Sequence, residues 1–266
     1  KIREHGTLLG KIVPEGQKDQ DFYNPDLDNL VDQVSPKEPR TYNMDSRSTR
    51  DPSLLTTTSR SLKDSRSVRN SSLLTVTSRS LKGKKTIVCI DCGMKNNILR
   101  NFLDRDVTVI RVPWDYDFIT AGLEFDGIFM SNGPGDPAML TPLHNTIKKA
   151  LKLNKPIFGI CLGSQIMALA AGAKTYKLKF GHRSQNQPCI DVETGRCYIT
   201  SQNHGFAVDE KTLPKDWKVW LKNANDDTVE GIKHKTLPFF SCQFHPEAMP
   251  GPTDTEHFFD QFISLL

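Results

Sequence analysis

The chain has 266 residues, of which 37% are hydrophobic and 25% are charged, and its formal net charge is +4. This length and apolar content fit one or two folded domains. No stretch approaches the ~18 to 20 consecutive apolar residues that a membrane-spanning helix needs. The chain begins at Lys1 without a signal-type apolar segment, so we expect a piece of a longer polypeptide. Composition therefore argues against a membrane-embedded protein.

The segment 46–85 differs from its surroundings. It contains ten Lys or Arg and two Asp, a net charge of +8, so the rest of the chain carries −4. The run Ser53–Lys63 returns almost unchanged as Ser72–Lys82, and two copies are too few for a solenoid. Ser, Thr and Arg with few large apolar residues favour a disordered linker. It is either a duplication without catalytic role or a phosphorylation target whose phosphates would cancel the positive charge.

Beyond this segment, strand-like and helix-like patterns alternate. Strands are predicted at 86–90, 107–112, 127–130 and 156–160, and helices at 96–105 and 142–153. The alternation predicts an α/β fold: a mostly parallel open sheet with helices on both faces and function at the carboxyl ends of the strands. Shorter strands at 188–192, 197–200, 219–223 and 228–232 predict a mixed β extension, and 253–266 an amphipathic helix.

A sharp turn with a thiol at its apex follows the fourth predicted strand. Gly159-Ile160-Cys161-Leu162-Gly163 places two glycines around the cysteine, a spacing typical of a strained strand-to-helix turn that presents a nucleophile. The helix predicted over 164–172 aims its free N–H groups at the sulfur, which favours the thiolate. A buried structural cysteine is the alternative, but the paired glycines favour a catalytic one.

A base for this cysteine is predicted near the end of the chain. The strand predicted over 239–244 ends in His245-Pro246-Glu247, because proline cannot continue a central ladder. Glu247 lies two residues from His245, so in extended backbone both point the same way. A carboxylate beside an imidazole orients it and stabilises the imidazolium. His204 is a rival base, but it is predicted to lie among the loop residues Asn203–Phe206 and has no adjacent carboxylate.

The loop Ser131–Pro137 follows the third predicted strand and contains Gly133-Pro134-Gly135. The glycines permit close backbone approach to a ligand. The loop can supply one N–H to an oxyanion and Leu162 a second, although alone it would be read as a tight turn.

The six cysteines point to reduced thiols in an intracellular compartment. Cys89-x-x-Cys92 invites a redox or metal interpretation, but no second Cys/His pair stands at zinc-site spacing. We therefore predict no metal site here.

The motifs together resemble class I (triad-type) glutamine amidotransferases. Gly-Ile-Cys-Leu-Gly-x-Gln, His-Pro-Glu and Ser-Asn-Gly-Pro-Gly-Asp-Pro carry the resemblance. Asp91-x-Gly93-x-Lys95-x-Asn97 and the segment Gln202–Glu210 narrow it to the glutaminase domain or small subunit of carbamoyl phosphate synthetase, in its fused eukaryotic form. The resemblance implies a flavodoxin-like domain at 86–266 and makes 1–45 the tail of an incomplete preceding domain. That domain donates part of the glutamine site in the family.

The resemblance also implies roles for individual residues. Cys161 is the nucleophile, His245 the base and then the acid, and Glu247 its orienter. The amides of Gly133 and Leu162 form the oxyanion hole. Contacts to glutamine fall to Gly133, Gly135, Leu162, Gln165, Asn203, Gly205 and Phe206. Ser164 departs from the His that many relatives carry, but serine suits a helix start.

The implied reaction is hydrolysis of glutamine through a cysteine thioester, with ammonia passed to a carbamoyl phosphate synthetase domain or large subunit. We expect no cofactor in this chain and place ATP and Mg²⁺ in that partner, with no nucleic acid or membrane partner. Another cysteine γ-glutamyl amide hydrolase and a non-catalytic structural domain are the alternatives. The pathway is either pyrimidine or arginine biosynthesis, and the expected compartment is the cytoplasm, with the mitochondrion as the alternative.

Overall fold

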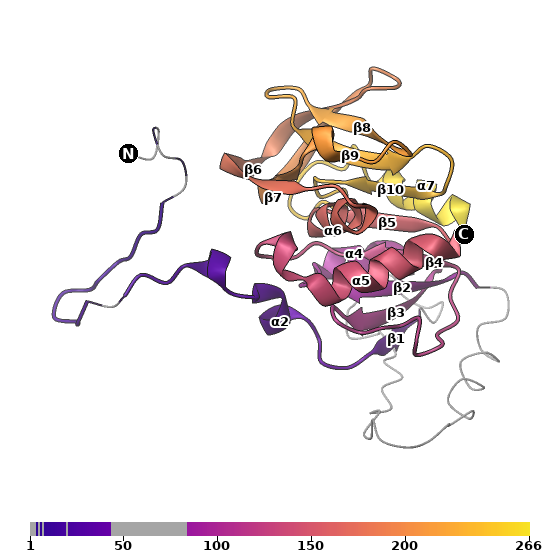
Figure 1. Ribbon diagram of the computed structural model, residues 1–266, viewed down its shortest axis with the longest axis horizontal. Helices are drawn as coiled ribbons and strands as arrows, with labels where there is room; N and C mark the ends of the chain where they lie inside the picture. The colour runs from indigo at the N-terminus through magenta and orange to yellow at the C-terminus, as the bar shows by residue number, and fades with distance from the viewer. Residues whose placement is uncertain (1–3, 5, 7, 20, 44–83) are drawn as a thin grey trace.

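The computed structural model describes residues 4, 6, 8–19, 21–43 and 84–266. The predicted linker lies outside these residues except for Lys84 and Lys85. The described part of the chain builds one ten-stranded mixed sheet in the order β1-β3-β2-β4-β5-β10-β9-β8-β6-β7 (Figure 1). None of its helices is long and apolar enough to cross a bilayer.

Five parallel strands form the predicted part of the sheet. They are β3 (Thr108–Pro113), β2 (Thr86–Asp91), β4 (Gly127–Met130), β5 (Ile157–Ile160) and β10 (Phe239–Cys242). Every residue of β2, β4, β5 and β10 is buried, as expected for parallel strands that are covered on both faces. The four predicted strands therefore exist within one residue of their expected ends, and β10 stops two residues early.

Helices cover both faces, as the alternation predicts. Helices α5 (Thr141–Ala150) and α6 (Leu162–Ala171) lie on one face, in front of the sheet in Figure 1. Helices α4 (Asn96–Leu103) and α7 (His257–Leu265) bury their apolar residues on the other face. The predicted helix at 142–153 is divided into α5 and the 3-10 turn η4 (Leu151–Leu153), after which Asn154 takes a left-handed φ of 55°.

Phenylalanine pairs pack β5 against β10, the two strands that lead into the site, and α4 against β4. Phe158 on β5 stacks on Phe240 on β10 with ring centroids 4.6 Å apart. Phe102 of α4 meets Phe129 of β4 edge-on at 4.8 Å. Each such pair contributes about 0.5–1.5 kcal/mol beyond its buried area. The stacked pair holds β5 and β10 in parallel register, with Cys242 opposite Ile160.

The antiparallel half of the sheet differs from the prediction in length. Instead of short strands, β6 (Thr175–Asp191) and β7 (Cys197–Val208) form one long hairpin, followed by β8 (Trp217–Asn223) and β9 (Val229–His234). The stretch Asn203–Phe206, which we placed in a loop, is strand. Polar side chains interrupt the apolar pattern there, so backbone pairing, with bulges after Lys177 and Ser184, defines the hairpin instead.

Residues before the linker also join this unit. Strand β1 (Arg40–Tyr42) pairs antiparallel with β3, and the short helix α2 (Leu30–Val34) precedes it. Ser35 Oγ donates to Asp91 O at 2.6 Å and accepts from the Trp114 N–H. The division of the chain at residues 45 and 85 stays a prediction. At the other end, α7 begins at His257, four residues later than predicted, because 254–256 form a turn.

Candidate active site

Cys161 lies in the turn between β5 and α6, at the predicted position. Its φ of 54° and ψ of −104° fall in a region that non-glycine residues rarely adopt, so the turn is strained. The Cys161 N–H donates to Cys242 O at 2.8 Å, which ties the turn to the end of β10. The local sequence thus places a thiol where β5 and β10 end side by side.

Gly159 and Gly163 are required because neither position has room for a side chain. A Cβ on Gly159 would lie 2.6 Å from the Gly163 carbonyl carbon and oxygen, and one on Gly163 would overlap the Met130 carbonyl. Neither position tolerates a side chain without moving backbone. The Gly-x-Cys-x-Gly spacing is therefore explained by contacts between β4, β5 and the start of α6.

His245 and Glu247 follow β10, as predicted. His245 Nδ1 lies 2.8 Å from Glu247 Oε1, and both side chains are buried. The His245 N–H donates to Ser201 O at 2.9 Å, which holds the segment against β7. With Nδ1 engaged by the carboxylate, Nε2 is the imidazole nitrogen that is left for Cys161.

The charges of these three groups support one another. Burial lowers the pKa of His245, but hydrogen bonds to Cys161 and Glu247 outweigh this and raise the pKa to about 10. Burial raises the pKa of Glu247, yet His245 and Lys95 bring it below its usual value. The site thus favours an imidazolium beside a carboxylate, the arrangement that stabilises a thiolate.

Two further residues hold Glu247, and we predicted no role for them. Lys95 Nζ lies 2.9 Å from Glu247 Oε1 and donates to Ala248 O at 2.8 Å. The side-chain amide of Asn97 donates to Glu247 O. Both belong to the Asp91-x-Gly93-x-Lys95-x-Asn97 motif that we used only for family resemblance. The sequence did carry a signal for such a role, because both are polar residues that follow a buried strand.

The Gly133–Gly135 loop lies against the start of α6. A Cβ on Gly133 would overlap Cys92 O, and Gly135 has a φ of 86°, so both positions require glycine. The Gly163 N–H donates to Ser131 O at 3.1 Å, which binds the two turns together. Within the described residues, the N–H groups of Gly133 and Leu162 donate to no protein acceptor. Both remain available to an oxyanion.

A cavity of about 850 Å³ lies between these loops and the hairpin β6–β7, a volume suited to a small ligand. Its lining includes the predicted residues Cys161, His245, Gly133, Gly135, Gln165, Asn203, Gly205 and Phe206. Leu162 and Glu247 do not line it. Gln165 Nε2 donates to Phe206 O at 2.8 Å and to Gln243 Oε1 at 3.0 Å, so α6 is joined to the hairpin across the cavity floor.

The cavity wall also carries residues that we did not predict. Lys177 and Arg183 from β6 add positive charge, and Asp26 forms an ion pair with Lys177. Leu9 and Leu30 from the N-terminal segment also line the cavity. These contacts join segments that are distant in the sequence, so no local sequence pattern predicted them.

His204 is a poorer base than His245. It is buried on β7, and burial lowers its pKa to about 3. Its Nδ1 lies 2.9 Å from Phe206 O and its Nε2 3.0 Å from Gln202 Oε1. In the part of the chain that the structure describes, no carboxylate is hydrogen-bonded to His204 as Glu247 is to His245. The geometry therefore favours His245 as the base.

The other cysteines do not compete with Cys161. All six are free thiols. Cys89 and Cys92 are fully buried, and burial raises the pKa of both, which suppresses the reactive thiolate. Cys89 Sγ contacts Met94 Sδ at 3.4 Å. Neither sulfur belongs to a group of side chains arranged to hold a metal in the described part of the chain.

Comparison with known proteins agrees with this geometry. Residues 88–265 match the family described as Glutamine amidotransferase class-I. The chain is 46% identical, over 99% of its length, to the multifunctional protein CAD of Squalus acanthias, and 43% identical, over its whole length, to the multifunctional protein pyrABCN of Emericella nidulans. It is 41% identical to the human mitochondrial carbamoyl-phosphate synthase [ammonia], again over its whole length.

The chain spans only 10–15% of the length of these three relatives. A crystal structure of a putative GMP synthase component from Thermoplasma acidophilum shares the fold, with a TM-score of 0.59 and 26% identity. The superposition covers 68% of this chain and 94% of that one. By its matching residues and its fold, the chain belongs to the class I glutamine amidotransferases.

Proposed function

We propose that this chain hydrolyses glutamine to glutamate and ammonia and passes the ammonia to a carbamoyl phosphate synthetase domain. The observation that carries the proposal is the buried Cys161–His245–Glu247 group at the wall of the cavity. The strained backbone of Cys161 holds its thiol beside the buried, hydrogen-bonded pair His245–Glu247.

The reaction starts with the attack of the Cys161 thiolate on the side-chain amide carbon of glutamine. The N–H groups of Gly133 and Leu162 receive the negative oxygen, and one such donor is worth about 3–4 kcal/mol. His245 then protonates the amide nitrogen, the C–N bond breaks, and ammonia leaves a γ-glutamyl thioester. His245 next takes a proton from water, the hydroxide attacks the thioester, and glutamate and the thiol are released.

The cavity lining includes polar residues that can hold a bound glutamine. The family implies contacts to Gln165 and to the hairpin residues Asn203, Gly205 and Phe206, and all of these line the cavity together with Cys161. The Phe206 carbonyl and the Gln165 amide are already hydrogen-bonded to each other. This bond fixes the position of Gln165 relative to the hairpin.

The destination of the ammonia is inferred from the relatives. One relative is named as a carbamoyl-phosphate synthase and others as multifunctional proteins of which this chain matches a small part. A synthetase part would supply ATP and Mg²⁺. Because the human relative is named for ammonia, similarity alone does not distinguish a working glutaminase from a structural domain. The intact Cys161–His245–Glu247 geometry favours the glutaminase.

Two measurements on the full-length protein test the proposal. Ammonia release from glutamine should be lost in Cys161→Ser and kept in Cys197→Ser, a control cysteine that is exposed on β7. An electrophilic glutamine analogue should label Cys161, as located by mass spectrometry. Undiminished release by Cys161→Ser, or a label on another residue, would show that the chain is not a cysteine-dependent glutaminase.

A further inference from the structure

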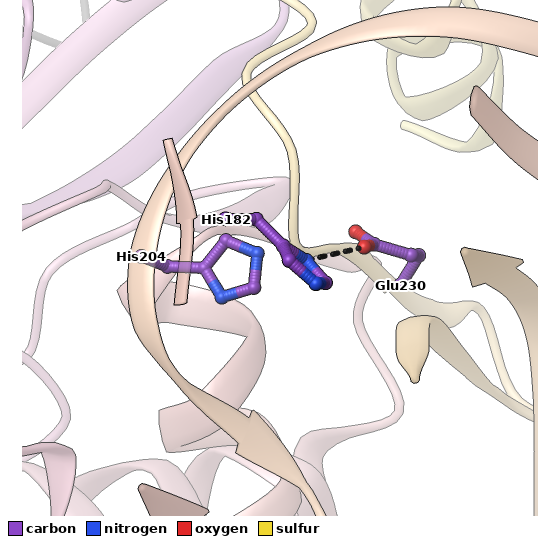
Figure 2. Close-up of side chains that lie close together, drawn as sticks. All are labelled: His182, His204 and Glu230. Atoms are coloured by element: carbon purple, nitrogen blue, oxygen red, sulfur yellow. Dashed lines mark ion pairs between the residues drawn. The ribbon is translucent and has the colours of Figure 1, made fainter. Parts of the chain in front are cut away.

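A second cluster of ionisable side chains lies beside the glutamine cavity. Figure 2 shows its members: His182 from β6, His204 from β7 and Glu230 from β9. One nitrogen or oxygen of each lies within 4.8 Å of those of the other two. Among the described residues, this is the one such group of His, Cys, Asp or Glu. The proposed glutaminase chemistry uses neither His182 nor Glu230.

The donor set and its spacing suit a zinc-type ion. Two imidazoles and one carboxylate are a known set of three protein ligands for Zn²⁺. His182 Nδ1 and Glu230 Oε1 lie 3.3 Å apart. Two ligands at ordinary zinc distances and a tetrahedral angle are separated by about 3.3 Å, so this pair needs no rearrangement.

The outer nitrogens of both histidines are already engaged. His182 Nε2 lies 2.9 Å from Asp226 Oδ2, and His204 Nδ1 lies 2.9 Å from Phe206 O. Both partners are acceptors, so each outer nitrogen carries the proton and each inner nitrogen can turn a lone pair toward the cluster. A metal-ligating histidine almost always donates its second N–H to a carboxylate or backbone carbonyl in this way.

The centre of the cluster has more acceptors than protons. Both inner nitrogens lie 3.0 Å from the same oxygen, Gln202 Oε1. Glu230 is fully buried, and its Oε2 has no hydrogen-bond partner within the part of the chain that the structure describes. A neutral imidazole has one N–H, and that of His204 faces Phe206 O. A buried carboxylate oxygen without a partner is costly, and a cation would satisfy it.

We propose that His182, His204 and Glu230 form a binding site for a divalent cation of the zinc type, with Gln202 Oε1 or water as a fourth ligand. The ion has a route of entry, because His204 and Gln202 line the cavity. Two carboxylates lie beside His182, with Asp226 Oδ2 2.9 Å from Nε2 and Glu230 Oε1 3.3 Å from Nδ1. Their negative charge would attract a dication.

The site is connected to the glutamine pocket through one carbonyl. Phe206 O accepts from His204 Nδ1 at 2.9 Å and from Gln165 Nε2 at 2.8 Å. A cation bound to His204 Nε2 would reposition the imidazole ring and, through its Nδ1, the Phe206 carbonyl. If the proposed glutaminase function is correct, the bound ion should therefore raise the KM for glutamine.

The test measures metal binding directly and needs no turnover. The full-length protein is stripped with a chelator and titrated with Zn²⁺ against a chromogenic competitor, and with Co²⁺ for its visible spectrum. All variants are made on Cys161→Ser, because the Cys161–His245 pair is itself a zinc-binding arrangement. We expect one Zn²⁺ at this site and a tetrahedral Co²⁺ spectrum without a sulfur-to-metal charge-transfer band.

Substitutions then assign the ligands. His182→Asn and Glu230→Gln should weaken binding by more than the roughly 10- to 100-fold that loss of an outer partner costs. Asp226→Asn should weaken zinc binding by about 10- to 100-fold, because it removes an outer partner of His182. Asp226 is exposed, so this variant still tests the site if a variant of a buried ligand does not fold. His257→Asn, an exposed histidine of α7, is the control and should bind normally.

The inference is overturned if the Cys161→Ser protein takes up no zinc, or if His182→Asn binds as tightly as its parent. Either result would make the cluster a hydrogen-bonded network that neutralises Glu230. A thiolate band in the Co²⁺ spectrum would place the ion on a different cysteine. None of these outcomes depends on whether the protein hydrolyses glutamine.

Discussion

Replacing Glu247 with glutamine removes one buried negative charge and keeps the shape of the side chain. Glu247 is fully buried and bonded to His245 Nδ1 at 2.8 Å and to Lys95 Nζ at 2.9 Å. A hydrogen bond to a charged group is worth about 1.5–3 kcal/mol, which corresponds to a roughly 10- to 150-fold lower kcat/KM for glutamine. The glutamine oxygen can still accept from His245, so the site should stay assembled.

The direction of the pH effect is also fixed. Burial lowers the pKa of His245, but hydrogen bonds to Cys161 and Glu247 raise it to about 10. The His245 imidazolium is therefore present below about pH 10 and loses its proton above it. Without the Glu247 charge the pKa of His245 falls, so the alkaline limb of the kcat/KM profile should move to lower pH.

Steady-state ammonia release across pH measures both effects, with thermal unfolding as the check on folding. Glu210→Gln is the matched control, because Glu210 pairs with Lys222 at the surface and should leave both rate and profile unchanged. A Glu247→Gln enzyme with kcat/KM within about twofold of the parent and an unmoved alkaline limb would refute the orienting role of this carboxylate.

Three other predictions follow from particular contacts. In Lys95→Met, loss of the Glu247 partner should lower kcat by about 10-fold, measured by the same assay, whereas an unchanged kcat would mean that the contact to His245 alone keeps the carboxylate in place. In Gly163→Ala, the methyl group meets the Met130 carbonyl and should destabilise the fold by about 1–3 kcal/mol in urea unfolding; Gly10→Ala, with open space around it, should have little effect. Burial lowers the pKa of His204 in the folded protein from 6.5 to about 3. Below about pH 6.5 the unfolded chain therefore takes up a proton that the folded protein does not, and the free energy of unfolding decreases as the pH falls. Between pH 6.5 and 5 the parent should lose up to about 1.4 kcal/mol more per pH unit than His204→Asn, and equal slopes would show that His204 is not buried as a neutral ring.

Local sequence was enough to predict the parallel core and its turns. Continuous apolar runs predicted β2, β4, β5 and β10 because both faces of these strands are covered. The glycines at 159 and 163 predicted the turn because no side chain fits beside the Gly163 and Met130 carbonyls. Parallel strands end at the same edge, so the position of Cys161 after β5 followed from order, whereas that of His245 depended on the strand at 239–244 joining the sheet, as β10 does beside β5.

The hairpin β6–β7 could not be predicted in the same way. Tyr176, Leu178 and Phe180 alternate with lysines, a strand pattern that the prediction missed, whereas 181–187 and 201–206 are mostly polar and carry no apolar period. Backbone pairing with a distant segment decides their conformation. The prediction therefore placed Asn203–Phe206 in a loop and gave no role to Lys177 or Arg183.

The sequence by itself predicted the parallel strands and the positions of the proposed nucleophile and triad residues, because the strand patterns, the Gly-x-Cys-x-Gly turn and His-Pro-Glu are each runs of neighbouring residues. Only the tertiary structure decided that Lys95 and Asn97 support Glu247, and that His182, His204 and Glu230 share one buried cluster. These contacts join residues 22 to 152 positions apart, and side chains so distant in the chain meet only when the sheet is complete.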